Sequence, residues 1–182
     1  AGLLNKGTKN KTVAELEEAI QELGASLNVY SGKETITISG ITLARNYYKT
    51  LALAKEMLLE PRFDETEFEL LKKSTLSRLR QQEASPNTVA RNKYNELIYG
   101  EDNIRSKNTL GTSASVKLIT LEDVKNYYNN YISPSVAKVL FVGDITKEKV
   151  TQYLKDFNNN WEAKEVTIPV YKTPEAPKKP TV

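Results

Sequence analysis

The chain has 182 residues, of which 39% are hydrophobic and 27% charged, and its formal net charge is +3. These values are ordinary for one globular domain, or for one domain and a linker. The absence of cysteine excludes disulfides and thiolate zinc sites but leaves the redox compartment open. Because histidine is also absent, the commonest general base and zinc ligand is missing, and catalysis would need carboxylates, Lys, Tyr or Ser.

The ends of the sequence and the distribution of its charges further limit the kinds of protein to which it can belong. No apolar run is long enough to span a membrane, and no signal-peptide pattern opens the sequence. Since the sequence starts in mid-pattern at Ala1, without a methionine, we expect a fragment or a processed segment. Lys and Arg alternate with Glu and Asp, which is typical of solvated helix faces. A nucleic-acid surface would rest only on the pI of about 8.9, so we expect no nucleic-acid partner.

The first part of the chain predicts a capped helix followed by a β-hairpin. Gly7 and Thr8 end an apolar segment, and Thr12 then begins a helix with a capping box to Glu15. This helix is expected to end at Gly24. Runs of alternating polar and apolar residues at 26–30 and 34–41, with a turn at 31–33, predict an antiparallel hairpin with one face inward. The apolar face of the helix is predicted at Val13, Leu16, Ile20 and Leu23.

The rest of the chain is mostly helical in pattern. Residues 136–142 (VAKVLFV) are short and rich in β-branched side chains, which predicts the best buried strand of the chain. Residues 101–115 lack periodicity and predict a long surface loop. Helices are predicted over residues 43–59, with a buried stripe of Tyr47, Leu51, Ala54 and Leu58, over 64–84 after an Asp64 cap, over 85–99 after Ser85-Pro86, from Thr120 to the break at Ser133-Pro134, and over 146–157.

This order of elements predicts an α+β fold, an antiparallel sheet with helices packed on one face. Only three strands are convincing, so we expect strands that complete the sheet to precede Ala1. The domain is predicted to span residues 1–161. Residues 162–182, which are rich in proline and lysine, predict a linker toward a following domain.

Several side chains invite a functional interpretation that a structural one outweighs. Glu56 and Glu60 lie four apart, but without histidine or a third ligand they indicate solvated surface. The pairs Tyr47-Tyr48 and Tyr127-Tyr128 could stack on bases, but at helical spacing one ring of each pair is expected in the core with its hydroxyl at the rim. Acids near helix starts or off the apolar stripe are likewise expected to be exposed: Glu17, Glu18, Glu65, Glu67 and Glu69.

A series of short motifs resembles the M16 peptidase family, which includes insulinase, pitrilysin and mitochondrial processing peptidase. No single motif is specific, but the series runs in order through nearly all of residues 1–160. It consists of Gly7-Thr8-Lys9, Glu15-Leu16, Leu23-Gly24-Ala25, Leu27-Asn28, Tyr30, Glu56-Met57-Leu58, Pro61-Arg62-Phe63, Glu67-Phe68, Tyr99-Gly100, Gly111-Thr112, Thr120 to Val124, Tyr128, Pro134 and Val142-Gly143-Asp144.

The resemblance implies an M16 peptidase-like (LuxS/MPP-like) domain, and members of the M16 family are built from similar α+β domains arranged as a clamshell around a closed chamber. Active members carry an H-x-x-E-H zinc motif just before the Gly-Thr turn, and its Glu-His end would fall on Ala1 and Gly2. The region of the third ligand, a glutamate, falls at Ser77, Arg78 and Leu79. Neither Ala1 nor Gly2 can ligate zinc, and Arg78 would repel a cation.

The resemblance therefore implies a non-catalytic domain of an M16-type zinc metallopeptidase, which helps to form the chamber that holds peptide substrate. The alternative is a structural or assembly domain with no role in proteolysis. This chain alone is predicted to have no catalytic residue, no metal site and no cofactor; zinc is expected in the active half of a parent metalloendopeptidase. Other M16 domains, in cis or in trans, are the expected partners.

One strand is a candidate for contact with substrate. The run 26–30 corresponds to a strand that pairs with extended substrate in active members, which makes Asn28, Val29 and Tyr30 candidates. The interpretation that this strand only completes the sheet is favoured. An open sheet edge would predict self-association, or a segment supplied by a neighbour. A bacterial periplasm or cell envelope is slightly favoured over the cytoplasm.

Overall fold

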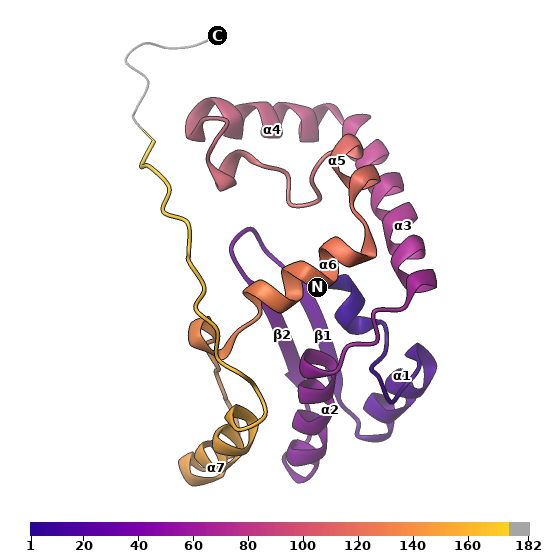
Figure 1. Cartoon of the computed structure of the whole chain (residues 1–182), viewed down its shortest axis with the longest axis vertical. Coiled ribbons are helices and arrows are strands. Elements are labelled where there is room, and N and C mark those ends of the chain that lie inside the picture. Colours follow the sequence, from indigo (N-terminus) through magenta and orange to yellow (C-terminus); the bar gives the residue numbers. More distant parts are fainter. Residues whose placement is uncertain (175–182) are drawn as a thin grey trace. The chain divides into compact units, whose positions relative to one another are not determined.

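The computed structural model describes residues 1–174, shown as coloured ribbon in Figure 1. The chain divides into two compact units. Unit 1 comprises Ala1–Tyr30, Thr37–Phe68 and Thr120–Thr167. Unit 2 comprises Ser31–Ile36, Glu69–Ile119 and the described residues from Ile168 onward. Each unit is therefore made of several separate stretches of the chain.

Unit 1 contains most of the two hairpin strands and most of the helices, whereas the hairpin turn, Ser31–Ile36, belongs to unit 2. Its strands are β1 (Ser26–Ser31) and β2 (Ile36–Ile41), which form a two-stranded sheet. Its α-helices are α1 (Val13–Glu22), α2 (Tyr47–Leu59), α6 (Leu121–Tyr131) and α7 (Lys147–Asn158), and its 3₁₀ helices are η1 (Gly2–Asn5), η2 (Ala44–Asn46) and η4 (Pro134–Val136).

Unit 2 contains the helices of the middle of the chain. The long helix α3 (Glu65–Glu83) begins in unit 1 and continues into unit 2. It is followed by α4 (Pro86–Tyr99), η3 (Ile104–Ser106) and α5 (Ser113–Leu118).

The helix starts follow the capping signals of the sequence. Thr12 and Glu15 form the predicted capping box, in which the Glu15 N–H donates to Thr12 Oγ1 at 3.3 Å and the Thr12 N–H donates to Glu15 Oε2 at 2.7 Å. Asp64 Oδ1 accepts from the Glu67 N–H at 3.1 Å and so caps α3. Because these capping hydrogen bonds are made within three residues, the sequence could predict where α1 and α3 begin.

The core of unit 1 is larger than that of unit 2. Leu16 of α1 and Met57 of α2 are almost fully buried. In unit 2 the buried hydrophobic side chains are Leu79 of α3 and Val116 of α5. The other buried hydrophobic side chains belong to unit 1 and are Leu3, Leu4, Val29, Leu53, Phe68 and Leu121.

The predicted α+β class and hairpin are confirmed. The turn lies slightly later than predicted, because the Gly32 N–H donates to Thr35 O at 2.8 Å and leaves Lys33 and Glu34 as a two-residue loop. The second strand consequently begins at Ile36.

The prediction of a buried strand at residues 136–142 is wrong. Val136 ends η4, and residues 137–142 have no regular structure. The side chains of Leu140 and Val142 are 87% and 90% exposed. A strand needs a partner for its backbone groups, and within residues 1–174 the only sheet is that of β1 and β2.

The predicted buried face of α2 is also wrong by about one position. The helix buries Thr50, Leu53 and Met57 in place of the predicted Tyr47, Leu51, Ala54 and Leu58. Thr50 can be buried because its hydroxyl donates to Asn46 O at 3.1 Å, within its own helix. Hydrophobicity alone could not place a threonine on the core face, so the predicted face differs from the observed one.

Residues 101–115 differ from the predicted loop, and only part of the predicted linker is described. The predicted loop at 101–115 contains η3 and the start of α5, whose N-cap Thr112 accepts from the Ser115 N–H at 3.1 Å. A helix of six residues is too short to show apolar periodicity. Of the predicted linker, residues 175–182 lie outside the described residues.

Candidate functional site

The turn that follows η1 is fixed by a glycine and by a buried threonine. Gly7 has a φ of 87°, and a Cβ placed there would lie 2.7 Å from Lys11 O. The hydroxyl of Thr8, which is 0% exposed, donates to Glu56 Oε1 of α2 at 2.6 Å. It also accepts from the Lys11 N–H at 3.0 Å. The Gly-Thr pair thus holds the start of α1 against α2.

Glu56 is the electrostatic centre of this turn. Its Oε2 lies 2.8 Å from the Nζ of Lys11. Burial would raise the pKa of Glu56, but the hydrogen bonds from Lys11 and Thr8 outweigh burial and hold the pKa below its ordinary value of 4.5. The prediction of solvated surface is therefore wrong for Glu56, whose largely buried carboxylate forms a structural ion pair, whereas Glu60 is exposed as predicted.

The residues that the sequence resemblance aligns with zinc positions do not fit a zinc ion. Ala1 precedes η1 and Gly2 is its first residue, and neither carries a donor atom on its side chain. Arg78 is an exposed cation on α3, beside Ser77 and the buried Leu79. No group of three or more His, Cys, Asp or Glu side chains suited to a metal occurs among the residues that the structure describes.

A second contact of the η1 segment reaches the hairpin. The side-chain amide of Asn5 binds both backbone groups of Val29: its Nδ2 donates to Val29 O at 2.7 Å, and its Oδ1 accepts from the Val29 N–H at 2.9 Å. Asn5 is half-buried and Val29 is 5% exposed. One side chain thus satisfies the outward-facing polar groups of the middle of β1.

A groove of about 270 Å³ lies beside this contact. Apolar side chains come from α1, β1 and α2, and polar side chains complete the lining. The space is large enough for one or two side chains of another segment. Its lining residues are Asn5, Leu16, Glu17, Ile20, Gln21, Ser26, Leu27, Asn28 and Met57.

The three predicted substrate-contact residues have different environments. Asn28 is exposed and lines the groove, and Tyr30 is exposed near the end of β1. Val29 is buried, and its backbone is bound by Asn5. Sequence analysis did not predict Asn5, because its contact joins positions 24 residues apart and leaves no local pattern.

One ring of each tyrosine pair packs in the core, as predicted, but the prediction of a hydroxyl at the rim is wrong for Tyr47, whose hydroxyl is buried without a hydrogen-bond partner among the described residues. Tyr47 is half-buried and packs against the rings of Phe141 and Tyr153, whereas Tyr48 is exposed. Tyr128 is half-buried and donates its hydroxyl to Leu58 O at 2.6 Å, and Tyr127 is exposed. One ring of each pair therefore belongs to the packing of unit 1.

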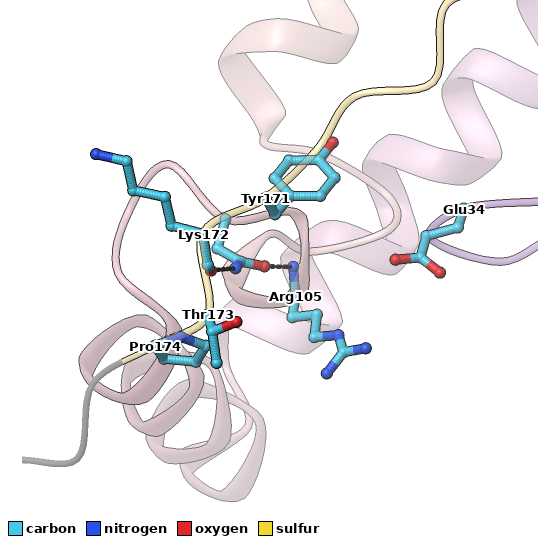
Figure 2. Close-up of a pocket in the computed structure, with 7 residues that line it drawn as sticks. Glu34, Arg105, Tyr171, Lys172, Thr173 and Pro174 are labelled. Atoms are coloured by element: carbon cyan, nitrogen blue, oxygen red, sulfur yellow. Dashed lines mark hydrogen bonds between the residues drawn. The ribbon is translucent and has the colours of Figure 1, made fainter.

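Unit 2 contains a separate shallow pocket of about 260 Å³, drawn in Figure 2. Asn103, which is buried, joins its walls: its side chain accepts from the Arg105 N–H at 2.9 Å and donates to Lys172 O at 3.4 Å. The C-terminal segment up to Pro174 is thereby held against the residues after α4. The lining consists of Glu34, Asn103, Arg105, Tyr171, Lys172, Thr173 and Pro174.

Comparison with known proteins identifies the family. Residues 2–112 match the family described as "Insulinase (Peptidase family M16)", and residues 118–182 match the "Peptidase M16 inactive domain". A probable mitochondrial-processing peptidase subunit beta of Arabidopsis thaliana is 26% identical over 84% of this chain and 29% of its own length. The "Non-peptidase homolog YmxG" of Helicobacter pylori is 26% identical over 87% of this chain and 36% of its own length.

Solved structures share the fold. A peptidase M16 inactive domain from Pseudomonas fluorescens has a TM-score of 0.86 at 20% identity, over 96% of this chain and 43% of that one. The periplasmic protease PqqL of Escherichia coli has a TM-score of 0.78 at 16% identity, over 94% of this chain and 20% of that one.

The chain spans about a third of the length of the curated relatives that it matches. Within residues 1–174 no helix combines the length and the apolar character needed to cross a membrane. The family match covers more than half of the chain, and the structural similarity extends over nearly all of it. The chain therefore belongs to the insulinase family, peptidase family M16.

Proposed function

We propose that the chain is a non-catalytic domain of an M16-type zinc metallopeptidase and helps to form the closed chamber that holds peptide substrate. The proposal is supported by the resemblance, which aligns Ala1, Gly2 and Arg78 with the family's zinc-site residues, and by the observation that the Gly-Thr turn, α1 and the hairpin are present. The scaffold of an active domain is present without its metal-binding chemistry.

The remaining chemistry is assigned to the longer protein. Zinc and the catalytic base belong to an active M16 domain, in the same polypeptide or in a partner chain. This division is supported by the comparison with curated relatives, because the chain matches only about a third of the length of each. A bacterial periplasm or cell envelope is the proposed location, supported by the fold shared with a protease described as periplasmic.

The first experiment measures zinc and activity of this chain. After dialysis against zinc followed by removal of free metal, we expect far less than one zinc per chain and no cleavage of quenched fluorescent peptides. A related M16 protein with an intact H-x-x-E-H motif, treated in the same way, is the control. Stoichiometric zinc in this chain, or cleavage by it alone, would contradict the proposal.

The second experiment tests the chamber. A substrate peptide carrying a photoreactive group is irradiated with the longer protein after its catalytic glutamate has been replaced by glutamine. We expect crosslinks on this domain as well as on the active domain, and an excess of unlabelled substrate should remove both. Crosslinks confined to the active domain would count against a chamber wall built from this chain.

An alternative role is structural or in assembly, without proteolysis. The relative from Helicobacter pylori is described as a non-peptidase homolog, which favours this alternative. The two roles differ in what accompanies the chain: an H-x-x-E-H motif in the same or a neighbouring polypeptide supports the chamber, and its absence from both supports the assembly role.

The proposal includes association through exposed extended backbone. The apolar segment of residues 137–142 presents Leu140 and Val142 to solvent, and β2 pairs only with β1 among the described residues. Self-association, or a strand from a neighbouring domain, would cover these groups. The candidates Asn28, Val29 and Tyr30 remain a proposed contact for extended peptide, although the bond of Asn5 to Val29 favours a strand that only completes the sheet.

A further inference from the structure

The contact between Asn5 and Val29 has the hydrogen-bond pattern of strand pairing. In an antiparallel sheet, two opposed residues exchange an N–H···O bond in each direction. The amide of Asn5 makes the same exchange with Val29, at 2.7 Å and 2.9 Å. The Asn5 side chain therefore makes the two hydrogen bonds that a residue of a neighbouring strand would make.

The register of the hairpin shows which edge of β1 this is. The two-residue loop is closed by Gly32 and Thr35. Since hydrogen-bonded pairs alternate along an antiparallel hairpin, Asn28 and Tyr30 direct their backbone groups toward β2. Leu27 and Val29 direct theirs to the outer edge. In agreement, Gly40 lies opposite Leu27, whose Cδ2 would be 2.5 Å from a Cβ at Gly40.

The groove continues from this edge. Leu16 and Ile20 of α1 and Met57 of α2 provide apolar surface, and Leu27 provides the strand side. Asn5 itself lines the groove. A segment that paired with the outer edge of β1 would therefore meet a space for an apolar side chain, but at Val29 it would meet the amide of Asn5.

We propose that Asn5 closes the outer edge of β1 against strand addition, and that this edge accepts an extended peptide when the Asn5 side chain is removed. The peptide would bind through the backbone groups of Leu27 and Val29 and place an apolar side chain in the groove. This inference concerns the edge of this chain and holds whether or not the longer protein cleaves peptides.

The test compares Asn5→Ala with Asn10→Ala in the whole chain. Asn10 is a matched control, because its amide also makes a side-chain hydrogen bond near the same turn, to the exposed Glu60 at 3.0 Å. The probe is a short fluorescein-labelled peptide in which Val alternates with Thr and Lys, and binding is measured by fluorescence anisotropy. We expect Asn5→Ala to bind about tenfold more tightly than the unsubstituted chain or Asn10→Ala.

Amide hydrogen exchange locates the bound peptide. The Val29 amide should exchange slowly in the unsubstituted chain and faster in Asn5→Ala, and the peptide should restore protection at Leu27 and Val29 in the variant. Asn28 and Tyr30, already paired with β2, should not change. A folded Asn5→Ala variant that binds no better than the unsubstituted chain overturns the proposal, as does protection that appears at residues 137–142 instead.

A second variant covers the case in which Asn5→Ala does not fold. Asn5→Asp retains an acceptor for the Val29 N–H but cannot donate to Val29 O, so the edge is only half closed. Its affinity for the peptide should lie between those of the unsubstituted chain and an open edge. An affinity equal to that of the unsubstituted chain overturns the proposal.

Discussion

At the scale of single residues, Glu56 couples stability to pH. Its pKa is lower in the folded chain than its ordinary value of 4.5, so the carboxylate stabilises the fold fully above that value. This stabilisation is lost as the pH falls through the lower, folded-state pKa. Glu56→Gln should reduce the free energy of unfolding by about 1–3 kcal/mol at neutral pH, because Lys11 loses its charged partner. Urea unfolding at a series of pH values measures the difference, which should shrink in acid.

Glu60→Gln is the matched control for this prediction. Glu60 is exposed and accepts one side-chain hydrogen bond, from Asn10. Its substitution should change the free energy of unfolding by no more than about 0.5 kcal/mol. Equal losses in the two variants, or a loss for Glu56→Gln that persists unchanged in acid, would show that the ion pair does not have this role.

Gly7 gives a second prediction at this scale. Gly7→Ala would combine a left-handed backbone with a Cβ 2.7 Å from Lys11 O. Gly24 also has a positive φ, 55°, but a Cβ there would meet only Leu43 Cδ1, at an ordinary contact distance of 3.8 Å. Gly24→Ala should therefore cost about 1–2 kcal/mol from backbone strain alone, and Gly7→Ala should cost at least about 1 kcal/mol more. Chemical denaturation of both variants tests this, and equal costs would show that the close approach is relieved.

Single residues also show how much of the candidate site could be predicted from the sequence. The expectation that Ala1, Gly2 and Arg78 stand at the zinc positions came from the resemblance to the M16 family. The role of Asn5 could not be predicted, because an asparagine beside a turn has many possible partners. Only the folded chain brings its amide to Val29.

At the scale of elements, local chemistry determined which predictions succeeded. The boxes at Thr12 and Thr120 and the caps at Asp64 and Ser85 satisfy backbone donors within three residues, so sequence alone located these helix starts. A strand is different, because its hydrogen bonds are made to another segment. The VAKVLFV pattern has strand propensity, but propensity cannot form a strand without a partner.

The exposed apolar segment leads to a prediction about association. Replacing both Leu140 and Val142 by lysine should weaken self-association of the chain in sedimentation experiments, because exposed charges oppose edge pairing. Both side chains are almost fully exposed, so the free energy of unfolding should change by no more than about 0.5 kcal/mol for each.

Leu118→Lys is the control for this double substitution. Leu118 is 80% exposed but lies on α5, away from the extended segment in sequence and in unit 2. It should leave self-association unchanged. A chain that is monomeric before any substitution, or an equal effect of Leu118→Lys, would exclude residues 137–142 as the associating surface.

At the scale of the whole molecule, the two units differ in how much apolar surface they bury. The buried hydrophobic side chains lie mainly in unit 1, whereas α4 of unit 2 has no buried residue. Exposed helices with few apolar contacts open more readily than helices that contribute to a core. The two units should consequently differ in local stability, even though both consist largely of well-capped helices.

Native-state hydrogen exchange tests this difference directly. We expect the amides of α2, which buries Leu53 and Met57, to be the slowest to exchange, and those of α4 to exchange at least about tenfold faster, a difference of about 1.4 kcal/mol in opening free energy. A substitution in the core of unit 1, Met57→Ala, should accelerate α2 more than α4 if the units open separately. Equal acceleration of both helices would mean that the chain opens as one cooperative unit, so that the division seen in the packing would have no counterpart in stability.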